Sequence, residues 1–267
     1  MRISVLIDLI KLTIVFGGTW ALFTFIPFSF DPPEMQLSIE KEEKLGDLIV
    51  DEMVLKDKNT IVISNPGLDS AMNIISKILT SKIGNTDYEY KIKVIENETI
   101  NAFTLPGGNI FIYSGLIEFS DHPEELAAVL AHEIGHVEKR HVVNKLIKEL
   151  GLTLLFSVLA GGDNILTQEI GRTAMSSVFD RKQEEEADLF ALELLEKARI
   201  NPKVMAIFFR RMNDKLGNYN ENLEILASHP NNNSRIKSAL EYQTKDNFKS
   251  QKLNLNWEFV KKSLKSK

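Results

Sequence analysis

The chain of 267 residues contains no cysteine. This absence excludes disulfide bonds, thiolate metal ligands, a cysteine nucleophile and a lipid anchor carried on cysteine. Any metal must therefore be held by histidine, aspartate or glutamate, and the chain has only five histidines. An excess of basic residues is also absent: the net charge is −5, and scattered Lys and Arg give no footprint for nucleic-acid binding. There is no internal repeat, and 43% hydrophobic residues predict one domain plus an accessory segment.

One segment lacks charge: residues 12–30 read LTIVFGGTWALFTFIPFSF. As a helix this run would be about 28 Å long, close to the hydrocarbon thickness of a bilayer. We therefore expect a single-pass membrane anchor over 1–33, with a cleaved signal peptide or a buried core helix as alternatives. The positive-inside tendency places the rest of the chain on the non-cytoplasmic side, since basic residues precede the run and acidic residues follow it (Arg2, Lys11; Asp31, Glu34).

Apolar spacing predicts a mostly helical α+β domain over 34–245 and a loosely held polar tail over 246–267. Helical spacing occurs in the stretches 38–56, 68–82, 121–142, 185–198 and 202–216. Strand patterns occur at 60–64, 88–96 and 101–114, the last as two short strands around a Pro-Gly-Gly turn. A second apolar run, 150–162, is too short to cross a bilayer, and we expect a buried or membrane-grazing hairpin there.

Three of the five histidines lie in one stretch, AHEIGHVEKRH, at residues 131–141. On a helix that begins at Ser120 or Asp121, His132 and His136 project within about 40° of each other, opposite an apolar face. Two imidazoles four residues apart can reach one Zn²⁺ ion. Glu133 stands beside them, where it can take a proton from a water without being a ligand. A chance pair of solvated histidines is the alternative.

Helix geometry excludes the third histidine of this stretch. On a continuous helix His141 lies about 180° round from His132, so the two cannot share a metal unless the helix breaks first. We expect a structural role for His141, and the same for His122 in the first helical turn.

A catalytic zinc needs a third protein ligand, which without cysteine must be histidine or a carboxylate. The stretch RKQEEEADLFALELLEKA, 181–198, has an apolar face with two carboxylates at its edge, Glu184 and Asp188. Unpaired carboxylates there would be costly, so we expect zinc at Glu184 and the N–H of a ligand imidazole at Asp188. The alternative is a charged first turn that complements the helix dipole, which we accept for Glu185 and Glu186.

Four motifs together resemble one family, the HtpX/BepA/Oma-type membrane-associated zinc metallopeptidases, with the CAAX prenyl protease as a more distant relative. The resemblance covers about residues 60–240 and rests on HEIGH at 132–136, Glu184-x-x-Ala187-Asp188, NAFTLPGG at 101–108, and Ser228-His229-Pro230. It implies a gluzincin-like fold, in which an active-site helix, a second helix with the glutamate ligand and a small sheet surround the cleft.

By position, the resemblance implies that His132, His136 and Glu184 hold one Zn²⁺ per chain, that Glu133 is the catalytic acid and base, and that Asp188 supports a ligand. It also places His229 near the cleft, as a donor to the oxyanion or as a histidine stiffened by Pro230 at a helix entry. The strand that begins with Asn101, Ala102 and Phe103 would offer an open edge to an extended substrate.

The expected function is a zinc endopeptidase that acts on polypeptides, misfolded or membrane-associated, in membrane-proximal quality control. A binding module that keeps the fold without catalysis, and a hydrolase of small molecules, are the alternatives. HtpX-type members carry several spans and BepA-type members append helical repeats; neither pattern is found here, so we expect a minimal single-span protease.

Overall fold

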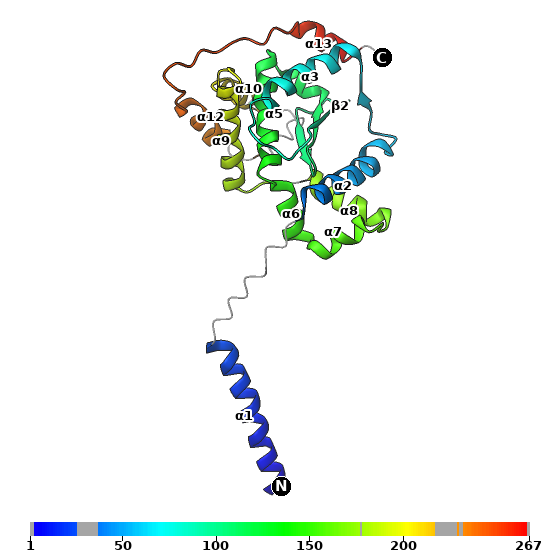
Figure 1. Cartoon of the computed structure of the whole chain (residues 1–267), viewed down its shortest axis with the longest axis vertical. Helices are drawn as coiled ribbons and strands as arrows, with labels where there is room; N and C mark the ends of the chain where they lie inside the picture. The colour runs from blue at the N-terminus through cyan, green and yellow to red at the C-terminus, as the bar shows by residue number, and fades with distance from the viewer. Residues whose placement is uncertain (1–2, 26–36, 177, 217–228, 230–231, 266–267) are drawn as a thin grey trace. The chain divides into compact units, whose positions relative to one another are not determined.

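The computed structural model describes residues 3–25, 37–176, 178–216, 229 and 232–265. The chain divides into two compact units, Met1–Gln36 and Leu37–Lys267 (Figure 1). In the first unit, helix α1 (Ile3–Phe25) contains residues 12–25 of the predicted span, and 26–30 lie outside the described residues. No helix within the described ranges has the length and apolar character needed to span a membrane.

The second unit has a sheet of four short strands, β1 (Val62–Ile63), β2 (Lys91–Ile95), β3 (Ala102–Leu105) and β4 (Asn109–Tyr113). Their order is β1-β2-β4-β3, with β2 and β4 parallel and the other two pairs antiparallel. The turn between β3 and β4 uses Gly107 and Gly108 with φ of +74° and +76°, which glycine adopts without strain. All predicted strands are therefore present, with β3 at one edge of the sheet.

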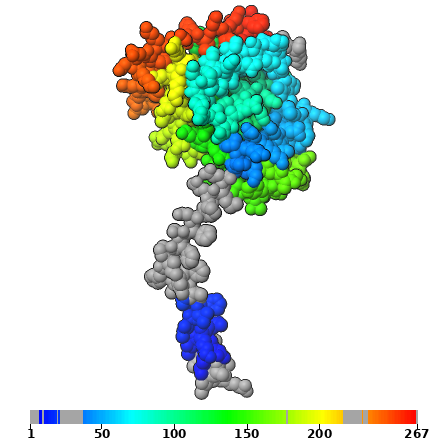
Figure 2. All heavy atoms as spheres, in the orientation of Figure 1, coloured from blue at the N-terminus to red at the C-terminus, as the bar shows by residue number. Residues whose placement is uncertain are grey.

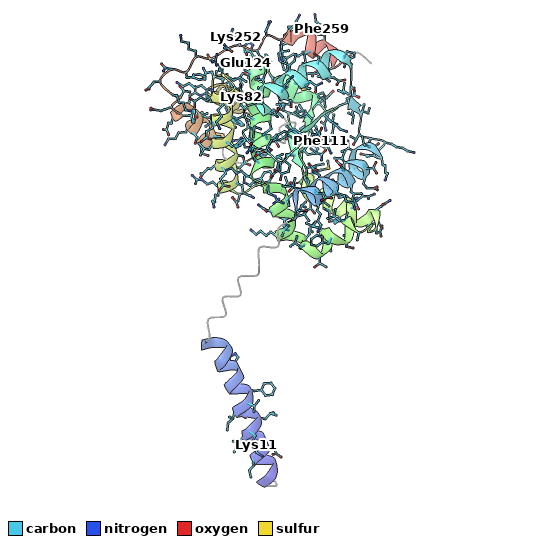
Figure 3. All side chains as sticks on the ribbon, in the orientation of Figure 1. Lys11, Lys82, Phe111, Glu124, Lys252 and Phe259 are labelled. Carbon is cyan, nitrogen blue, oxygen red and sulfur yellow. The ribbon has the colours of Figure 1, made fainter. Side chains whose placement is uncertain are left out.

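Helices cover both faces of the sheet. One face packs on α3 (Pro66–Thr80) and α5 (Pro123–Glu138), with α4 (Ser114–Phe119) joining β4 to α5. The other face packs on α2 (Ile39–Val50), which continues as the π-helical turn η1 (Asp51–Leu55), and on α8 (Asn164–Met175). Alternate strand residues enter the two cores: Ile110 and Ile112 belong to the core on the α3–α5 side, and Phe111 to the core on the α2 side. Phe111 is labelled in Figure 3.

The helix predicted over 121–142 is interrupted. It begins at Pro123, with His122 as the N-cap, ends at Glu138 and is followed by α6 (His141–Leu150). Arg140 between them has a φ of +55°, a left-handed conformation that a continuing helix cannot contain. The prediction of one unbroken helix was therefore wrong. The position around the helix that was predicted for His141, relative to His132, does not apply either, because His141 follows the break.

The apolar run 150–162 forms α7 (Leu152–Leu159) rather than a hairpin. Leu155 and Val158 are buried in the core that α7 shares with α2, and Lys44 Nζ donates to the Leu159 carbonyl at 3.0 Å. The run is therefore used for packing along one face, as the buried alternative of the prediction expected.

The remaining helices are α9 (Arg181–Lys197), α10 (Val204–Leu216), α12 (Asn232–Glu241) and α13 (Trp257–Ser263). The last contradicts the loosely held tail that the lysine and serine content of 246–267 predicted. Trp257 is 6% exposed and its indole N–H donates to the Ser120 carbonyl at 2.8 Å, while α13 lies against α3 (Figure 2). Two buried apolar residues of α13, Trp257 and Val260, belong to the main core.

Candidate metal centre

Helix α5 carries His132, Glu133 and His136 into the interior, where none of the three is more than 2% exposed. Gly135 between them allows α9 to approach closely. A Cβ atom built at Gly135 would lie 3.0 Å from the Ala187 carbonyl oxygen and 3.1 Å from its Cα. The glycine of the HEIGH sequence therefore sets how near the second helix comes to the two histidines.

Helix α9 carries Glu184 and Asp188 to the same place. Its start is fixed by a capping box, in which the Asp180 carboxylate accepts the Gln183 N–H and the Gln183 side chain accepts the Asp180 N–H. Glu184 follows in the first turn and Asp188 one turn later, 2% and 5% exposed. The same edge of α9 thus delivers both carboxylates that the sequence singled out.

Four buried side chains converge: His132, His136, Glu184 and His229 each offer one ligand atom, and these atoms all lie within 4.8 Å of one another. The Nε2 atoms of His132 and His136 are 3.0 Å apart. Glu184 Oε1 lies 3.3 Å from His136 Nε2, and Glu184 Oε2 lies 3.6 Å from His132 Nε2. The structure therefore brings together the three side chains that the sequence assigned to a metal.

His229 lies deeper in this cluster than the sequence indicated. Its Nδ1 is 2.8 Å from Glu184 Oε1 and 3.2 Å from His132 Nε2, while its Nε2 is 3.6 Å from Glu133 Oε1. One ring nitrogen thus faces the candidate ligands and the other faces the candidate base. Pro230, the basis of the helix-entry alternative, is outside the described residues.

Asp188 supports His132 from behind, as the sequence predicted for a ligand imidazole. Its Oδ1 is 2.9 Å from His132 Nδ1, so the ring can donate there and leave Nε2 facing the cluster. The sequence reasoning missed Arg235, which is 3% exposed and donates to Asp188 from Nη2 at 2.7 Å and from Nε at 3.0 Å. Arg235 on α12 is not part of any recognisable sequence motif. The one hint in the sequence was Asp188 itself, because a buried carboxylate requires a positively charged or hydrogen-bonding partner.

Burial perturbs the acidity of these groups. Desolvation raises the pKa of Glu133 to about 7, against the opposing effect of His229. Glu184 is also desolvated, yet His229 and His132 beside it hold its pKa below the ordinary value. Desolvation lowers the pKa of His136 well below its ordinary value, so its ring is neutral at physiological pH. The cluster therefore combines a neutral imidazole at His136 with one ionised carboxylate, Glu184, and one carboxyl near its titration point, Glu133.

A divalent cation fits this cluster. Among the described residues, both carboxylate oxygens of Glu133 and Oε2 of Glu184 are buried without a hydrogen-bond partner. Buried polar atoms without partners are rare and call for an ion or a water. Imidazole nitrogens and a carboxylate oxygen are ligands that zinc binds.

His141 is close to the cluster, contrary to the expectation from a continuous helix. Its Nδ1 is 2.9 Å from His136 Nδ1, and its Nε2 is 3.2 Å from Glu186 Oε2. The chain reverses at Arg140, so the first residue of α6 turns back toward α5. Glu186 was assigned to a charged first turn, and the structure gives it this further contact. The sequence gives no clear signal for the break, because residues 136–150 contain neither glycine nor proline.

Asn101, Ala102 and Phe103 lie at the start of β3, the edge strand next to α5. The strand lies at the edge of the sheet, as the sequence predicted. The prediction that this edge is open to a substrate does not agree with the structure. Residues 101–105 are each 8% exposed or less, since helices on both faces cover the strand. A substrate strand could reach this edge only if its cover moved.

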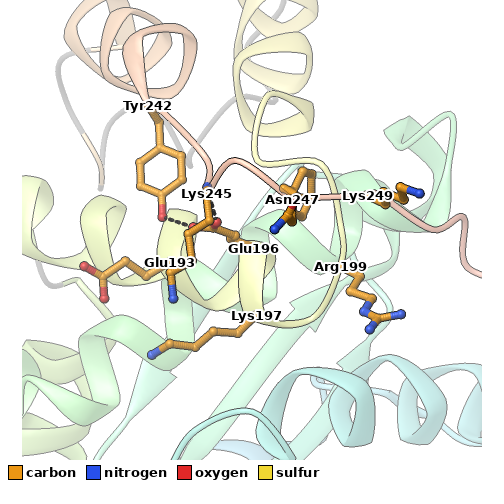
Figure 4. Close-up of a pocket in the computed structure, with 9 residues that line it drawn as sticks. Glu193, Glu196, Lys197, Arg199, Tyr242, Lys245, Asn247 and Lys249 are labelled. Carbon is orange, nitrogen blue, oxygen red and sulfur yellow. Dashed lines mark hydrogen bonds between the residues drawn. The ribbon is translucent and has the colours of Figure 1, made fainter.

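A separate hollow of about 630 Å³ lies at the other end of α9 (Figure 4). There Glu196 accepts from the Tyr242 hydroxyl and from the Lys245 N–H, both at 2.7 Å. Residues 184 and 196 are about 18 Å apart along the helix, so the hollow is distinct from the metal cluster.

Comparison with known proteins agrees with this geometry. Residues 70–243 match peptidase family M48. The beta-barrel assembly-enhancing protease of Yersinia pestis is 28% identical over 216 residues, which are 76% of this chain and 44% of that protein. The mitochondrial metalloendopeptidase OMA1 of Schizosaccharomyces pombe is 25% identical over 235 residues, 86% of this chain and 70% of that protein.

A third relative, the metalloprotease LoiP of Escherichia coli, is 30% identical over 183 residues, 66% of this chain and 71% of that protein. The chain spans less than half the length of the beta-barrel assembly-enhancing proteases that it matches. These matches confirm the resemblance that the four sequence motifs indicated. Since the family match covers more than half of its residues, the chain belongs to peptidase family M48.

Proposed function

We propose that the protein is a zinc-dependent endopeptidase of gluzincin-like architecture. One observation carries the proposal: His132, His136 and Glu184 converge in the interior beside Glu133, a buried carboxyl without a hydrogen-bond partner. Membership of a metallopeptidase family supports it, as do the named activities of the relatives.

Zinc would be held by His132 Nε2, His136 Nε2 and a carboxylate oxygen of Glu184, one ion per chain. This set gives three protein ligands and leaves a position for reactants, as catalytic zinc sites require. When bound, zinc supplies Lewis-acid chemistry that acidifies a water molecule and polarises a peptide carbonyl.

Glu133 is the acid and base of the reaction. Its carboxylate takes the proton from the attacking water, and the resulting carboxylic acid returns that proton to the leaving amine. In the metal-free protein burial raises the pKa of Glu133 to about 7, and a cation beside it favours the carboxylate that the first half of this exchange requires.

His229 is the donor that stabilises the negative charge on the carbonyl oxygen in the transition state. Its Nε2 faces Glu133, whereas its Nδ1 lies among the candidate ligand atoms, so a fourth metal ligand is the alternative role. The two roles differ in their prediction for His229→Ala. A donor's loss lowers kcat by about 10²–10³ with zinc retained, whereas a ligand's loss weakens zinc binding.

Polypeptides are the proposed substrates, paired as an extended strand with β3 at Asn101, Ala102 and Phe103. Because these residues are buried, the proposal requires the edge to be uncovered on binding. A site that binds the substrate main chain, and not particular side chains, could accept many different misfolded or membrane-associated proteins. Strand pairing uses main-chain groups, which every polypeptide offers.

A membrane anchor over residues 12–30 is the remaining proposal, with the peptidase unit on the non-cytoplasmic side. It rests on the charge-free sequence, and on apolar side chains of α1 that are more than half exposed, Leu12, Ile14 and Trp20 among them. Carbonate extraction of membranes tests it. The full chain should stay in the pellet, and a variant with Ile14→Lys and Phe16→Lys should be released.

Casein degradation by the full chain tests the activity, with and without a chelator and beside Glu133→Gln. We expect wild-type cleavage that a chelator abolishes and zinc restores, and a loss of about 10²–10⁴-fold in Glu133→Gln. Equal inertness of wild type and Glu133→Gln, both loaded with zinc, would favour a binding module that keeps the fold without catalysis.

A further inference from the structure

The two histidines of the HEIGH sequence are supported from behind in different ways. His132 has a carboxylate at its outer nitrogen, Asp188 Oδ1 at 2.9 Å. His136 has another histidine there: its Nδ1 lies 2.9 Å from Nδ1 of His141. His141 in turn has a carboxylate at its far nitrogen, Glu186 Oε2 at 3.2 Å from Nε2.

The chemistry of metal binding fixes the direction of every hydrogen bond in this chain. A neutral imidazole that gives the Nε2 lone pair to a metal carries its proton on Nδ1. His136 Nδ1–H must then donate to His141 Nδ1, which accepts. His141 therefore carries its own proton on Nε2, and that N–H donates to the Glu186 carboxylate. His136, His141 and Glu186 can therefore form both hydrogen bonds with only one placement of the two imidazole protons.

Two contacts hold His141 and His136 in place. Arg140 turns the chain through its left-handed conformation, and its guanidinium donates from Nε to buried Glu42 at 3.1 Å. Phe179 stacks on the His136 ring with centroids 4.0 Å apart, which fixes the plane of that ring. His141 itself is 3% exposed, so no water competes freely for its nitrogens.

We propose that Glu186 and His141 form a positioning pair that sets the tautomer and orientation of His136, as Asp188 does for His132. The inference rests on the proposed metal centre and adds two residues to it. Neither residue belongs to the group of candidate metal ligands. Their contribution is to present Nε2 of His136 as a lone pair in the right direction, which strengthens metal binding before any chemistry occurs.

Zinc affinity of the full chain, measured by competition with a chromophoric chelator, is the readout. His141→Gln keeps a carbonyl that can accept from His136 Nδ1–H, whereas His141→Leu fills a similar volume with no acceptor. Loss of such an outer partner typically weakens metal binding by about 10–100-fold. We expect about that loss in His141→Leu and less than about threefold in His141→Gln.

Glu186→Gln is the second arm, with Glu185→Gln as its matched control. Glu185 is the neighbouring residue on α9 and pairs only with Arg181, at 2.9 Å among the described residues. We expect a loss of about threefold to tenfold in Glu186→Gln, because its effect passes through His141, and no change in Glu185→Gln.

Three results are decisive. Equal zinc affinity in His141→Leu and His141→Gln, whether both tight or both weak, would overturn the hydrogen-bond argument. Equal affinity in Glu186→Gln and Glu185→Gln would remove Glu186 from the pair. Failure of the wild-type chain to bind zinc would instead refute the metal centre itself, so the two failures are distinguishable. Circular dichroism of each metal-free variant identifies any loss that comes from unfolding.

Discussion

Glu133 should make the metal-free protein less stable as the pH rises through neutrality. Burial raises the pKa of this carboxyl to about 7 in the folded protein, against an ordinary value of 4.5 that holds in the unfolded chain. Between these two values the folded state binds more protons than the unfolded state, so the free energy of unfolding falls with rising pH. Glu133→Gln keeps the shape of the side chain and removes the titration.

The magnitude follows from the two pKa values. Their difference of about 2.5 corresponds to about 3.4 kcal/mol at high pH, of which about 2.5 kcal/mol is lost between pH 5 and pH 8. For a unit of this size that loss is about 5–10 °C in Tm. Glu133→Gln should therefore be close to wild type in stability at pH 5 and more stable by several degrees at pH 8.

Urea unfolding in the presence of a chelator, at both pH values, measures this gap. Glu133 and His229 are 3.6 Å apart and shift each other's pKa, so the difference between variant and wild type reports the coupled pair. Added zinc should narrow the gap, because a cation beside Glu133 favours its ionised form. A gap between variant and wild type that is the same at pH 5 and pH 8 would refute the assignment of the raised pKa to Glu133.

Three further substitutions test the packing around the site. Gly135→Ala should lower both zinc affinity and Tm. Overpacking against the Ala187 backbone costs about 1–3 kcal/mol, which is more than the roughly 1 kcal/mol gained in helix propensity. Unchanged zinc affinity would contradict the close approach of α9. Asp188→Ala should cost about 3–5 kcal/mol in urea unfolding because it removes the closest carboxylate partner of the buried Arg235 guanidinium, and a loss below about 1 kcal/mol would be inconsistent with that pair. Trp257→Ala should cost about 3–5 kcal/mol, whereas a loose tail would show no change.

The centre of the site was predictable because helix periodicity is rigid. His132 and His136 stand four residues apart within one uninterrupted helix, so their common direction follows from the sequence alone. Glu184 and Asp188 were predictable for a different reason. A carboxylate at the edge of an apolar face needs a partner, and the sequence suggested zinc for Glu184 and a ligand imidazole for Asp188. Both arguments use distances of one helical turn, over which the backbone cannot deviate far.

The outer contacts were not predictable, because they depend on where helices end. His141 was placed on the wrong side of the helix, since Arg140 adopts a conformation that sequence preferences disfavour and tertiary contacts with Glu42 stabilise. Arg235 reaches Asp188 from α12, across 47 residues, and no local pattern encodes such a contact. The prediction of a loosely held tail over 246–267 was wrong because burial of a single tryptophan, Trp257, fixes the segment in spite of its high lysine and serine content.

Helix α13 has a consequence for the order in which the protein can fold. The indole of Trp257 is bonded to residue 120, and the Ser263 carbonyl accepts from the Asn65 side chain at 2.9 Å, so the last helix closes the core built by the earliest ones. Contacts separated by well over a hundred residues form late, because their loop entropy must be overcome before they contribute. A nascent chain therefore carries the complete metal cluster, through residue 229, before the core behind it is sealed. The core around Trp257 is therefore complete only when residues 257–263 are docked against it.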